Sequence, residues 1–260
     1  MSNVINHLSE TLFQSWRNNQ AITPISDNYP ELTLHDAYLI QQKFIVRRLE
    51  TTGERIIGKK IGITSQTVMD LLGVDQPDFG ILTSDMYCAN NSTVSIKQLI
   101  APKAEGEIGF ILKRNLRGPG ITIADVLQAT DYVVPCIEIV DSRIRDWKIK
   151  ITDTVADNAS SGLFIIGNGT RLPSEIDLAA ITMTLEKNGK LIDTGIGAAA
   201  LGHPANAVAW LANMLGTLDM SLLRGEIILS GSLATMVPIN EGDRLKINLL
   251  GLGSAGVNFV

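Results

Sequence analysis

The chain has 260 residues, of which 45% are hydrophobic and 19% charged, so it can bury a substantial core in one large or two small domains. The formal net charge is -5 and no basic block is present, so nucleic acid is not an expected partner. The longest apolar runs are much shorter than the roughly 18 residues of a membrane-spanning helix. With no secretory signal and only Cys88 and Cys136 as cysteines, we expect a cytoplasmic protein without disulfides or a membrane segment.

The first third of the chain is predicted to be rich in helices. Apolar residues recur at helical spacing from Val4 to Trp16, which predicts an amphipathic helix over residues 1–20. A second helix is expected to begin after Thr33, with Asp36 as its capping partner, and to run towards Gly53. Alternation then predicts a strand over 56–64, and a short helix follows over 65–73.

Beyond residue 80 the pattern changes to many short β segments. Strands are expected at 94–100, 107–113, 132–140, 163–166, 181–187, 190–194, 226–229, 244–250 and 257–260. The pair Asn188-Gly189 predicts a tight hairpin, because a type I′ turn needs positive φ at both central residues. Thr122 and Pro204 each mark the start of a further helix. We therefore predict a helix-rich α/β part over 1–80 and a β-rich metal-binding catalytic core over 81–260.

Three glutamates suggest a metal site. In an extended strand Glu105 and Glu107 point to one face, where their charges repel each other unless a cation lies between them. Glu138 has only apolar neighbours, so its carboxylate also needs a partner. The alternative is that Glu105 and Glu107 pair with lysines or face water. Three carboxylates suit Mg²⁺ or Mn²⁺ better than zinc, and the three histidines are too widely spaced for a zinc cluster.

Lys60 and Asp78 are further polar residues with two interpretations each. The alternation over 56–64 places Lys60 on one face with Gly58 and Gly62, and Lys59 on the other. A lysine near three carboxylates would offset their charge and receive an anionic substrate, although a surface lysine is the simpler interpretation. Asp78 follows a proline in a predicted loop, where capping or turn formation is the ordinary role. The pattern alone leaves both roles open.

Several runs together resemble a known family along essentially the whole chain. The sequence is similar to the 2-oxopent-4-enoate (2-hydroxypenta-2,4-dienoate) hydratases of the fumarylacetoacetase-like superfamily, and the similar runs are Gly58-Lys-Lys-Ile-Gly62, Gly73-Val-Asp-Gln-Pro-Asp-Phe-Gly80, Glu105-Gly-Glu107, Glu138-Ile-Val-Asp-Ser-Arg-Ile-Arg-Asp-Trp147, Asp157-Asn-Ala-Ser160 and Leu201-Gly-His-Pro204. The 4-oxalocrotonate decarboxylases share the metal motif and the last two runs. The runs that resemble the hydratases in particular are Asp78-Phe79, Arg143-Ile-Arg-Asp-Trp147 and Leu229-Ser-Gly-Ser-Leu233. Ser161, in contrast, stands where many hydratases carry Cys and decarboxylases often carry Ser.

The resemblance implies an α+β fold with a mixed β-roll or sandwich core and a smaller helix-rich N-terminal part. It also implies a lyase of aromatic meta-cleavage catabolism that hydrates 2-hydroxypenta-2,4-dienoate to 4-hydroxy-2-oxopentanoate with Mg²⁺ or Mn²⁺. The positions that match the family's metal ligands are Glu105, Glu107 and Glu138. The implied reaction requires an acid and a base, for which Lys60 and Asp78 are the candidates, and Ser160 and Arg143 are the candidates for positioning substrate or water. For Arg143 a structural ion pair is the alternative.

Other functions stay open beside the hydratase. A decarboxylase acting on 4-oxalocrotonate would use the same ion to stabilise the enolate left when CO₂ departs. The chain could instead serve as a partner subunit, since the resemblance implies a homo-oligomer that associates with a sister decarboxylase or hydratase or with a downstream aldolase. A carbon–carbon hydrolase would need a water held by a His and a carboxylate, and no such pair is evident in the sequence.

Overall fold

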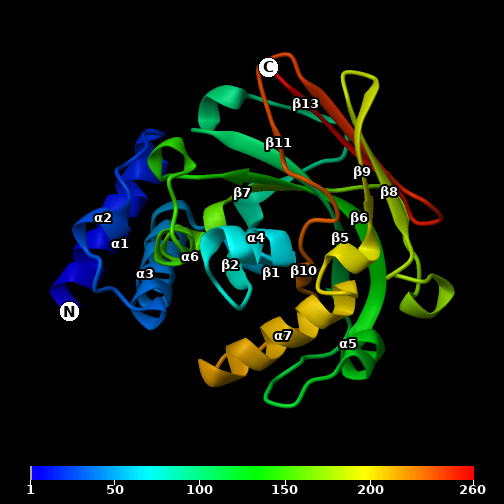
Figure 1. Cartoon of the computed structure of the whole chain (residues 1–260), viewed down its shortest axis with the longest axis horizontal. Coiled ribbons are helices and arrows are strands. Elements are labelled where there is room, and N and C mark those ends of the chain that lie inside the picture. The colour runs from blue at the N-terminus through cyan, green and yellow to red at the C-terminus, as the bar shows by residue number, and fades with distance from the viewer. Residues whose placement is uncertain (1) are drawn as a thin grey trace.

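Three helices begin the chain and lie together at one side of the molecule. The computed structural model describes residues 2–260 (Figure 1). The helices are α1 (Ser2–Asn18), α2 (Ile25–Asn28) and α3 (Leu34–Thr52). The predicted capping box of α3 is present, because the Thr33 hydroxyl accepts the N–H of Asp36 while the Asp36 carboxylate accepts the N–H of Thr33. The helix ends at Gly53, as predicted.

The larger sheet is mixed and contains strands from both halves of the chain. Its order is β2-β1-β10-β5-β6-β7-β3, with β11 beside β5. The strands are β1 (Ile56–Gly62), β2 (Asp78–Thr83), β3 (Tyr87–Cys88), β5 (Pro102–Leu112), β6 (Thr130–Asp141), β7 (Ser161–Ile166), β10 (Ile227–Leu229) and β11 (Val237–Pro238). The predicted boundary at residue 80 lies inside β2, and the division into two parts stays a prediction.

A second sheet packs against the first. It has the order β4-β13-β12-β8-β9, and its strands are β4 (Ser92–Val94), β8 (Thr182–Lys187), β9 (Lys190–Ile196), β12 (Arg244–Leu249) and β13 (Gly253–Phe259). The two sheets approach closely at Gly106 of β5, where an added Cβ would collide with the side chain of Met183 on β8. Gly106 therefore lets the second sheet pack behind the strand that carries Glu105 and Glu107.

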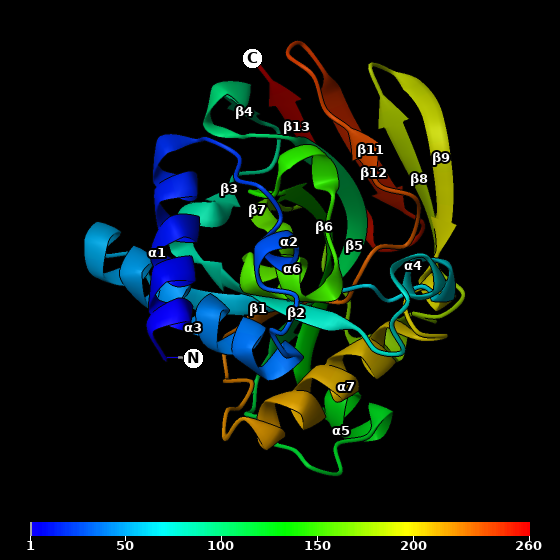
Figure 2. The same ribbon diagram turned by 60° about the vertical axis from the view of Figure 1, so that its left-hand side comes forward.

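Four further helices lie between the strands in sequence. They are α4 (Gln66–Leu72), α5 (Ile123–Ala129), α6 (Ile151–Ala156) and α7 (Pro204–Thr217). Of these, α6 packs against α3 while α5 packs against α7. Figure 2 shows α7 lying beside α5 below the larger sheet. In α7 the side chains of Val208, Leu211 and Leu215 are fully buried, which anchors this helix to the core. None of the helices in residues 2–260 is long and apolar enough to cross a membrane.

Most predicted elements are confirmed, and the α+β fold with a mixed β core is the observed one. The Asn188-Gly189 hairpin is present, with φ of 56° and 76°. The strand predicted over 94–100 is wrong, because β4 ends at Val94 and a short 3₁₀ turn follows over Ile96–Gln98. Asp78 was expected in a loop but begins β2, because β1 supplies an antiparallel partner that local sequence does not reveal.

Candidate metal centre and active site

The pairing of β5 with β6 brings the three predicted glutamates together. Glu105 lies directly opposite Glu138, and Glu107 lies two residues further along β5 on the same face. One carboxylate oxygen from each residue lies within 4.8 Å of the other two. Glu107 and Glu138 are buried, whereas Glu105 is half-buried. Solvent therefore reaches the cluster from the side of Glu105.

Several oxygens in this cluster have no hydrogen-bond partner. Glu107 Oε2 accepts the N–H of Gly231 at 2.7 Å. Glu107 Oε1 and both oxygens of Glu138 accept no hydrogen bond, although Lys60 Nζ lies 3.3 Å from Glu138 Oε1. Buried carboxylate oxygens without partners are costly. One lysine cannot balance three carboxylates, so this set of donors fits a hard divalent cation.

The electrostatics of the cluster show the same imbalance. Burial and the neighbouring Glu138 raise the pKa of Glu105 to about 7. Burial and the other two glutamates raise the pKa of Glu107 well above its ordinary value. Burial would lower the pKa of Lys60, but Glu138, Asp78 and the other glutamates outweigh it, so that the pKa is raised. Without a cation, protons are therefore held more tightly by Glu105 and Glu107, while Lys60 stays charged.

Lys60 and Asp78 converge above Gly62. Asp78 lies opposite Gly62 in the β1·β2 pair. A Cβ added at Gly62 would collide with Asp78 Oδ1 and would lie 3.3 Å from Lys60 Nζ. Asp78 Oδ2 accepts a hydrogen bond from the Thr154 hydroxyl at 3.3 Å, while Oδ1 has no partner. Burial raises the pKa of Asp78, although Lys60 opposes the shift. Asp78 is thus a buried carboxyl group in the site and not a turn-forming residue.

The two adjacent lysines point to opposite faces of β1, as the alternation predicts. Lys59 Nζ lies 2.7 Å and 2.8 Å from the two carboxylate oxygens of Glu226, whereas Lys60 faces Glu138. Both lysines are only 3% exposed, so the alternative of a surface lysine is wrong for Lys60. The burial of Lys59 in its own ion pair was not expected from the sequence.

Ser160 lies in a strained turn that follows α6. Asn158, Ala159 and Ser160 have φ of 56°, 49° and 53°, a left-handed conformation that is costly for residues other than glycine. The Ser160 hydroxyl is buried and has no hydrogen-bond partner. An unpaired buried hydroxyl held by a strained backbone is typical of a functional position.

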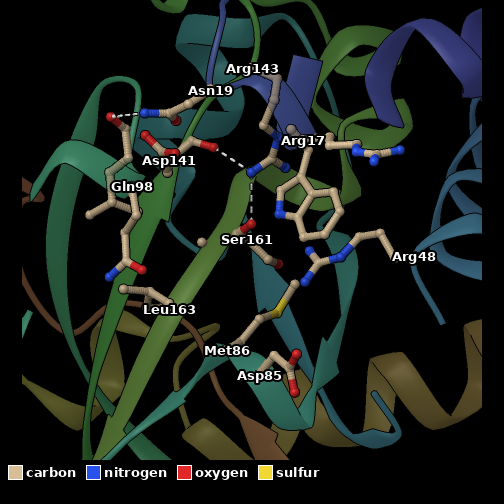
Figure 3. A pocket seen from close by; sticks show the side chains of 13 residues that line it. Arg17, Asn19, Arg48, Asp85, Met86, Gln98, Asp141, Arg143, Ser161 and Leu163 are labelled. Atoms are coloured by element: carbon tan, nitrogen blue, oxygen red, sulfur yellow. Dashed lines mark hydrogen bonds between the residues drawn. The ribbon is translucent and has the colours of Figure 1, made fainter. Parts of the chain in front are cut away.

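Arg143 makes its contacts within the chain. Its guanidinium donates to Asp157 Oδ1 at 2.5 Å, to the Asp141 and Ser161 carbonyls at 2.6 and 2.8 Å, and to the Asp157 carbonyl. Arg143 and Trp16 both line a pocket of about 370 Å³. Figure 3 shows Arg143 bonded to Asp141 and Ser161 at this pocket. The lining of this pocket includes none of the three glutamates, Lys60 or Asp78. These contacts favour the structural alternative for Arg143.

Three residues near the site were missed at the sequence level. Thr154 hydrogen-bonds Asp78, Gly231 hydrogen-bonds Glu107, and the Asn158 carboxamide binds the backbone of Ile81. Gly231 and Asn158 lie in runs that carry the family resemblance, so position in a shared run was an available signal. For Thr154 no such signal exists, because its contact depends on the packing of α6 against β2.

Comparison with known proteins places the chain in a family. Residues 61–260 match the family model described as fumarylacetoacetate (FAA) hydrolase C-terminal. The chain is 52% identical to a 2-hydroxyhexa-2,4-dienoate hydratase of Comamonas testosteroni over 96% of this chain and 95% of that protein. It is 54% identical to a 2-hydroxypent-2,4-dienoate hydratase of Pseudomonas putida over 82% and 96% of the two chains.

A solved structure has nearly the same fold. The 4-oxalocrotonate decarboxylase of Pseudomonas putida G7, complexed with magnesium and adipate, superposes with a TM-score of 0.97 at 37% identity, covering 100% of this chain and 98% of that one. The chain therefore belongs to the fumarylacetoacetate hydrolase family. Within it, the chain belongs to the 2-hydroxydienoate hydratases, because its identity to the two hydratases exceeds its identity to the decarboxylase.

The first prediction concerns the metal ligands. Glu105→Gln, Glu107→Gln and Glu138→Gln each keep the side-chain shape but remove one hard anionic ligand, so each should weaken Mg²⁺ binding by at least about tenfold and depress turnover. Titration calorimetry with Mg²⁺ measures the affinity. Circular dichroism should show a folded chain in all three variants, because each change lowers the charge repulsion. Unchanged Mg²⁺ affinity in all three would show that the ion binds elsewhere.

The second prediction concerns pH. Because the pKa of Glu105 is about 7 in the metal-free site, Mg²⁺ must displace a proton below that pH. Apparent Mg²⁺ affinity should therefore fall by about tenfold or more for each pH unit below 7. Calorimetry at pH 5.5, 6.5 and 7.5 measures this slope. Glu105→Gln removes one titrating group and should make the slope shallower, and an affinity that does not vary with pH would contradict the prediction.

Proposed function

We propose that the chain is a metal-dependent hydro-lyase that hydrates 2-hydroxypenta-2,4-dienoate to 4-hydroxy-2-oxopentanoate in aromatic meta-cleavage catabolism. The observation that carries this function is a buried Glu105–Glu107–Glu138 cluster beside Lys60 in a chain 52% identical to a dienoate hydratase over 96% of its length. The named relatives act on substrates of this class.

The three glutamates are proposed to hold Mg²⁺ or Mn²⁺. Their unpaired oxygens and mutual repulsion support this assignment, as does the magnesium in the related decarboxylase structure. When bound, the ion supplies a Lewis acid for the carboxylate and 2-oxygen of the substrate. The half-buried position of Glu105 leaves the substrate a path from solvent.

The reaction adds a proton at C5, the hydroxyl of water at C4 and a second proton at C3, and these two protons balance those lost by the substrate 2-hydroxyl and by the water. Lys60 is proposed to remain charged at neutral pH, because its pKa is raised, and to attract the anionic substrate or donate a proton. Asp78 is proposed to exchange protons with substrate or water at Oδ1, the oxygen without a partner. Its raised pKa suits it to this role. Ser160 is proposed to orient substrate or water through its unpaired hydroxyl.

The assembly and location are also proposals. We infer from the family resemblance that the enzyme is a cytoplasmic homo-oligomer that associates with a sister decarboxylase or a downstream aldolase. Size-exclusion chromatography with light scattering measures the oligomer, and co-purification with the aldolase tests the association. Turnover by the purified chain alone would exclude the alternative in which it serves only as a partner subunit.

The decarboxylase is the second candidate function, because the decarboxylase structure superposes over the whole chain. Ser161, the residue that resembles the decarboxylases, donates its hydroxyl to the Asn158 carbonyl, which is a role inside the turn. We expect the purified chain with Mg²⁺ to convert 2-hydroxypenta-2,4-dienoate to the hydroxy-oxo acid and to lose activity with a chelator. Release of CO₂ from 4-oxalocrotonate without hydration of the dienoate would overturn the hydratase.

The next prediction separates the two lysines of β1. Lys60→Met keeps the apolar part of the side chain and removes the charge, so kcat/KM should fall by at least about 10²-fold. Because Lys60 lies 3.3 Å from Glu138, its removal should leave Mg²⁺ affinity unchanged or make it tighter. Steady-state kinetics and calorimetry measure the two effects.

The control for Lys60→Met uses the other face of the same strand. Lys59→Met alone would leave the Glu226 carboxylate buried without its cation, which is destabilising. The double variant Lys59→Met/Glu226→Gln removes both charges and should keep kcat/KM within about threefold, while any loss appears in the Tm. If this control lost as much kcat/KM as Lys60→Met, a special role for Lys60 would be excluded.

A further inference from the structure

The outer edge of β2 is bound by side chains and not by another strand. β2 lies at the end of the larger sheet and pairs with β1 on one side. On its other side the Asn158 carboxamide accepts the N–H of Ile81 at 2.8 Å and donates to the Ile81 carbonyl at 2.9 Å. Asn158 and Ile81 are both buried. This carboxamide therefore makes the two backbone hydrogen bonds to β2 that a neighbouring strand would otherwise make.

The same asparagine begins the left-handed turn that ends in Ser160. Its φ of 56° is one that asparagine tolerates better than most residues. Gly80 of β2 packs directly on the turn, since a Cβ there would lie 2.5 Å from both the Asn158 carbonyl oxygen and the Ser161 hydroxyl. The turn and β2 are thus in direct contact, with Asn158 as the bonded link between them.

The two ends of this link carry groups of the proposed site. Asp78 lies three residues before Ile81 in β2, and Ser160 lies two residues after Asn158 in the turn. Each carries a buried oxygen without a partner. The metal-binding glutamates lie instead on β5 and β6. A change in the contact between the turn and β2 would therefore alter the placement of Asp78 relative to Ser160, while the strands that carry the glutamates stay paired through their own backbone hydrogen bonds.

We propose that Asn158 is a positioning residue that sets the placement of Asp78 against Ser160 and thereby controls proton transfer in the hydration reaction. This rests on the proposed roles of Asp78 and Ser160. Asn158 does not itself need to contact the substrate, because the oxygen and the nitrogen of its carboxamide are both hydrogen-bonded to the backbone of Ile81. Removing the carboxamide should lower kcat and leave Mg²⁺ affinity unchanged.

The chain contains a matched control for this contact. The Asn213 carboxamide accepts the N–H of Ile121 at 2.8 Å and donates to the Ile121 carbonyl at 2.9 Å, so it makes the same pair of bonds. Asn213 lies in α7 and binds the segment before α5, away from β2 and the turn. Losing this carboxamide removes equivalent hydrogen bonds without affecting the link between Asp78 and Ser160.

The experiment compares Asn158→Gly, which keeps the left-handed backbone, with Asn213→Ala, which keeps the helix. With 2-hydroxypenta-2,4-dienoate and Mg²⁺ we expect kcat to fall at least about tenfold in Asn158→Gly and less than about twofold in Asn213→Ala, since small misplacements of catalytic groups cost up to about 10²-fold. Mg²⁺ affinity should stay within about twofold of wild type in both variants, because neither changes a ligand.

A double-mutant cycle tests whether Asn158 acts through Asp78. If it does, adding Asn158→Gly to Asp78→Asn should lower kcat by less than about threefold, whereas the effects of two independent residues would multiply.

Equal losses of kcat in Asn158→Gly and Asn213→Ala, or multiplied losses in the cycle, would overturn the proposal. If Asn158→Gly does not fold, Asn158→Asp keeps the acceptor for the Ile81 N–H and is subject to the same criteria. A wild-type chain without hydratase activity would instead overturn the proposed function.

Discussion

The repulsion among three carboxylates on one face of the larger sheet is the constraint on which the site depends. Glu105, Glu107 and Glu138 are held within reach of one another by the β5·β6 pairing, and Lys60 alone cannot neutralise them. The sheet tolerates this arrangement if protons or a cation take up the excess charge. The raised pKa values of Glu105 and Glu107 favour the binding of protons. The carboxylate oxygens without hydrogen-bond partners favour the binding of a cation. Metal binding and protonation therefore compete for the same atoms.

The other groups of the proposed site lie on β1, on β2 and in the turn after α6, and each of these elements makes its own contacts. β1 presents Lys60 towards Glu138 while Lys59 is bound by Glu226 on the opposite face. The Asn158 carboxamide binds β2, and the Gln41 side chain of α3 donates to the Phe79 carbonyl beside it. The N-terminal helices thus help to hold the strand that begins with Asp78. Rigid elements position these groups more precisely than loops would.

The sequence could predict the parts of the site that follow from strand alternation. A period of two places Glu105 with Glu107 and separates Lys60 from Lys59, and these arrangements are confirmed. That Glu138 lies opposite Glu105 depends on strand register between distant segments, which alternation does not determine. Asp78 was misplaced in a loop for the same reason, since its strand depends on pairing with β1. The hydrogen bonds between Asn158 and Ile81 join positions 77 residues apart, so no local sequence pattern predicts them.

The near-identity of this fold with that of the related decarboxylase has a chemical consequence. The TM-score of 0.97 at 37% identity means that the same scaffold is compatible with hydration and with loss of CO₂. Both reactions develop enolate charge that a cation can stabilise, so the cluster of Glu105, Glu107 and Glu138 does not distinguish them. The reactions differ in where protons and water are delivered. Specificity between them therefore depends on groups around the cluster. The proposed candidates are Asp78 at the start of β2 and Ser160 in the adjoining turn, each of which has a buried oxygen without a partner.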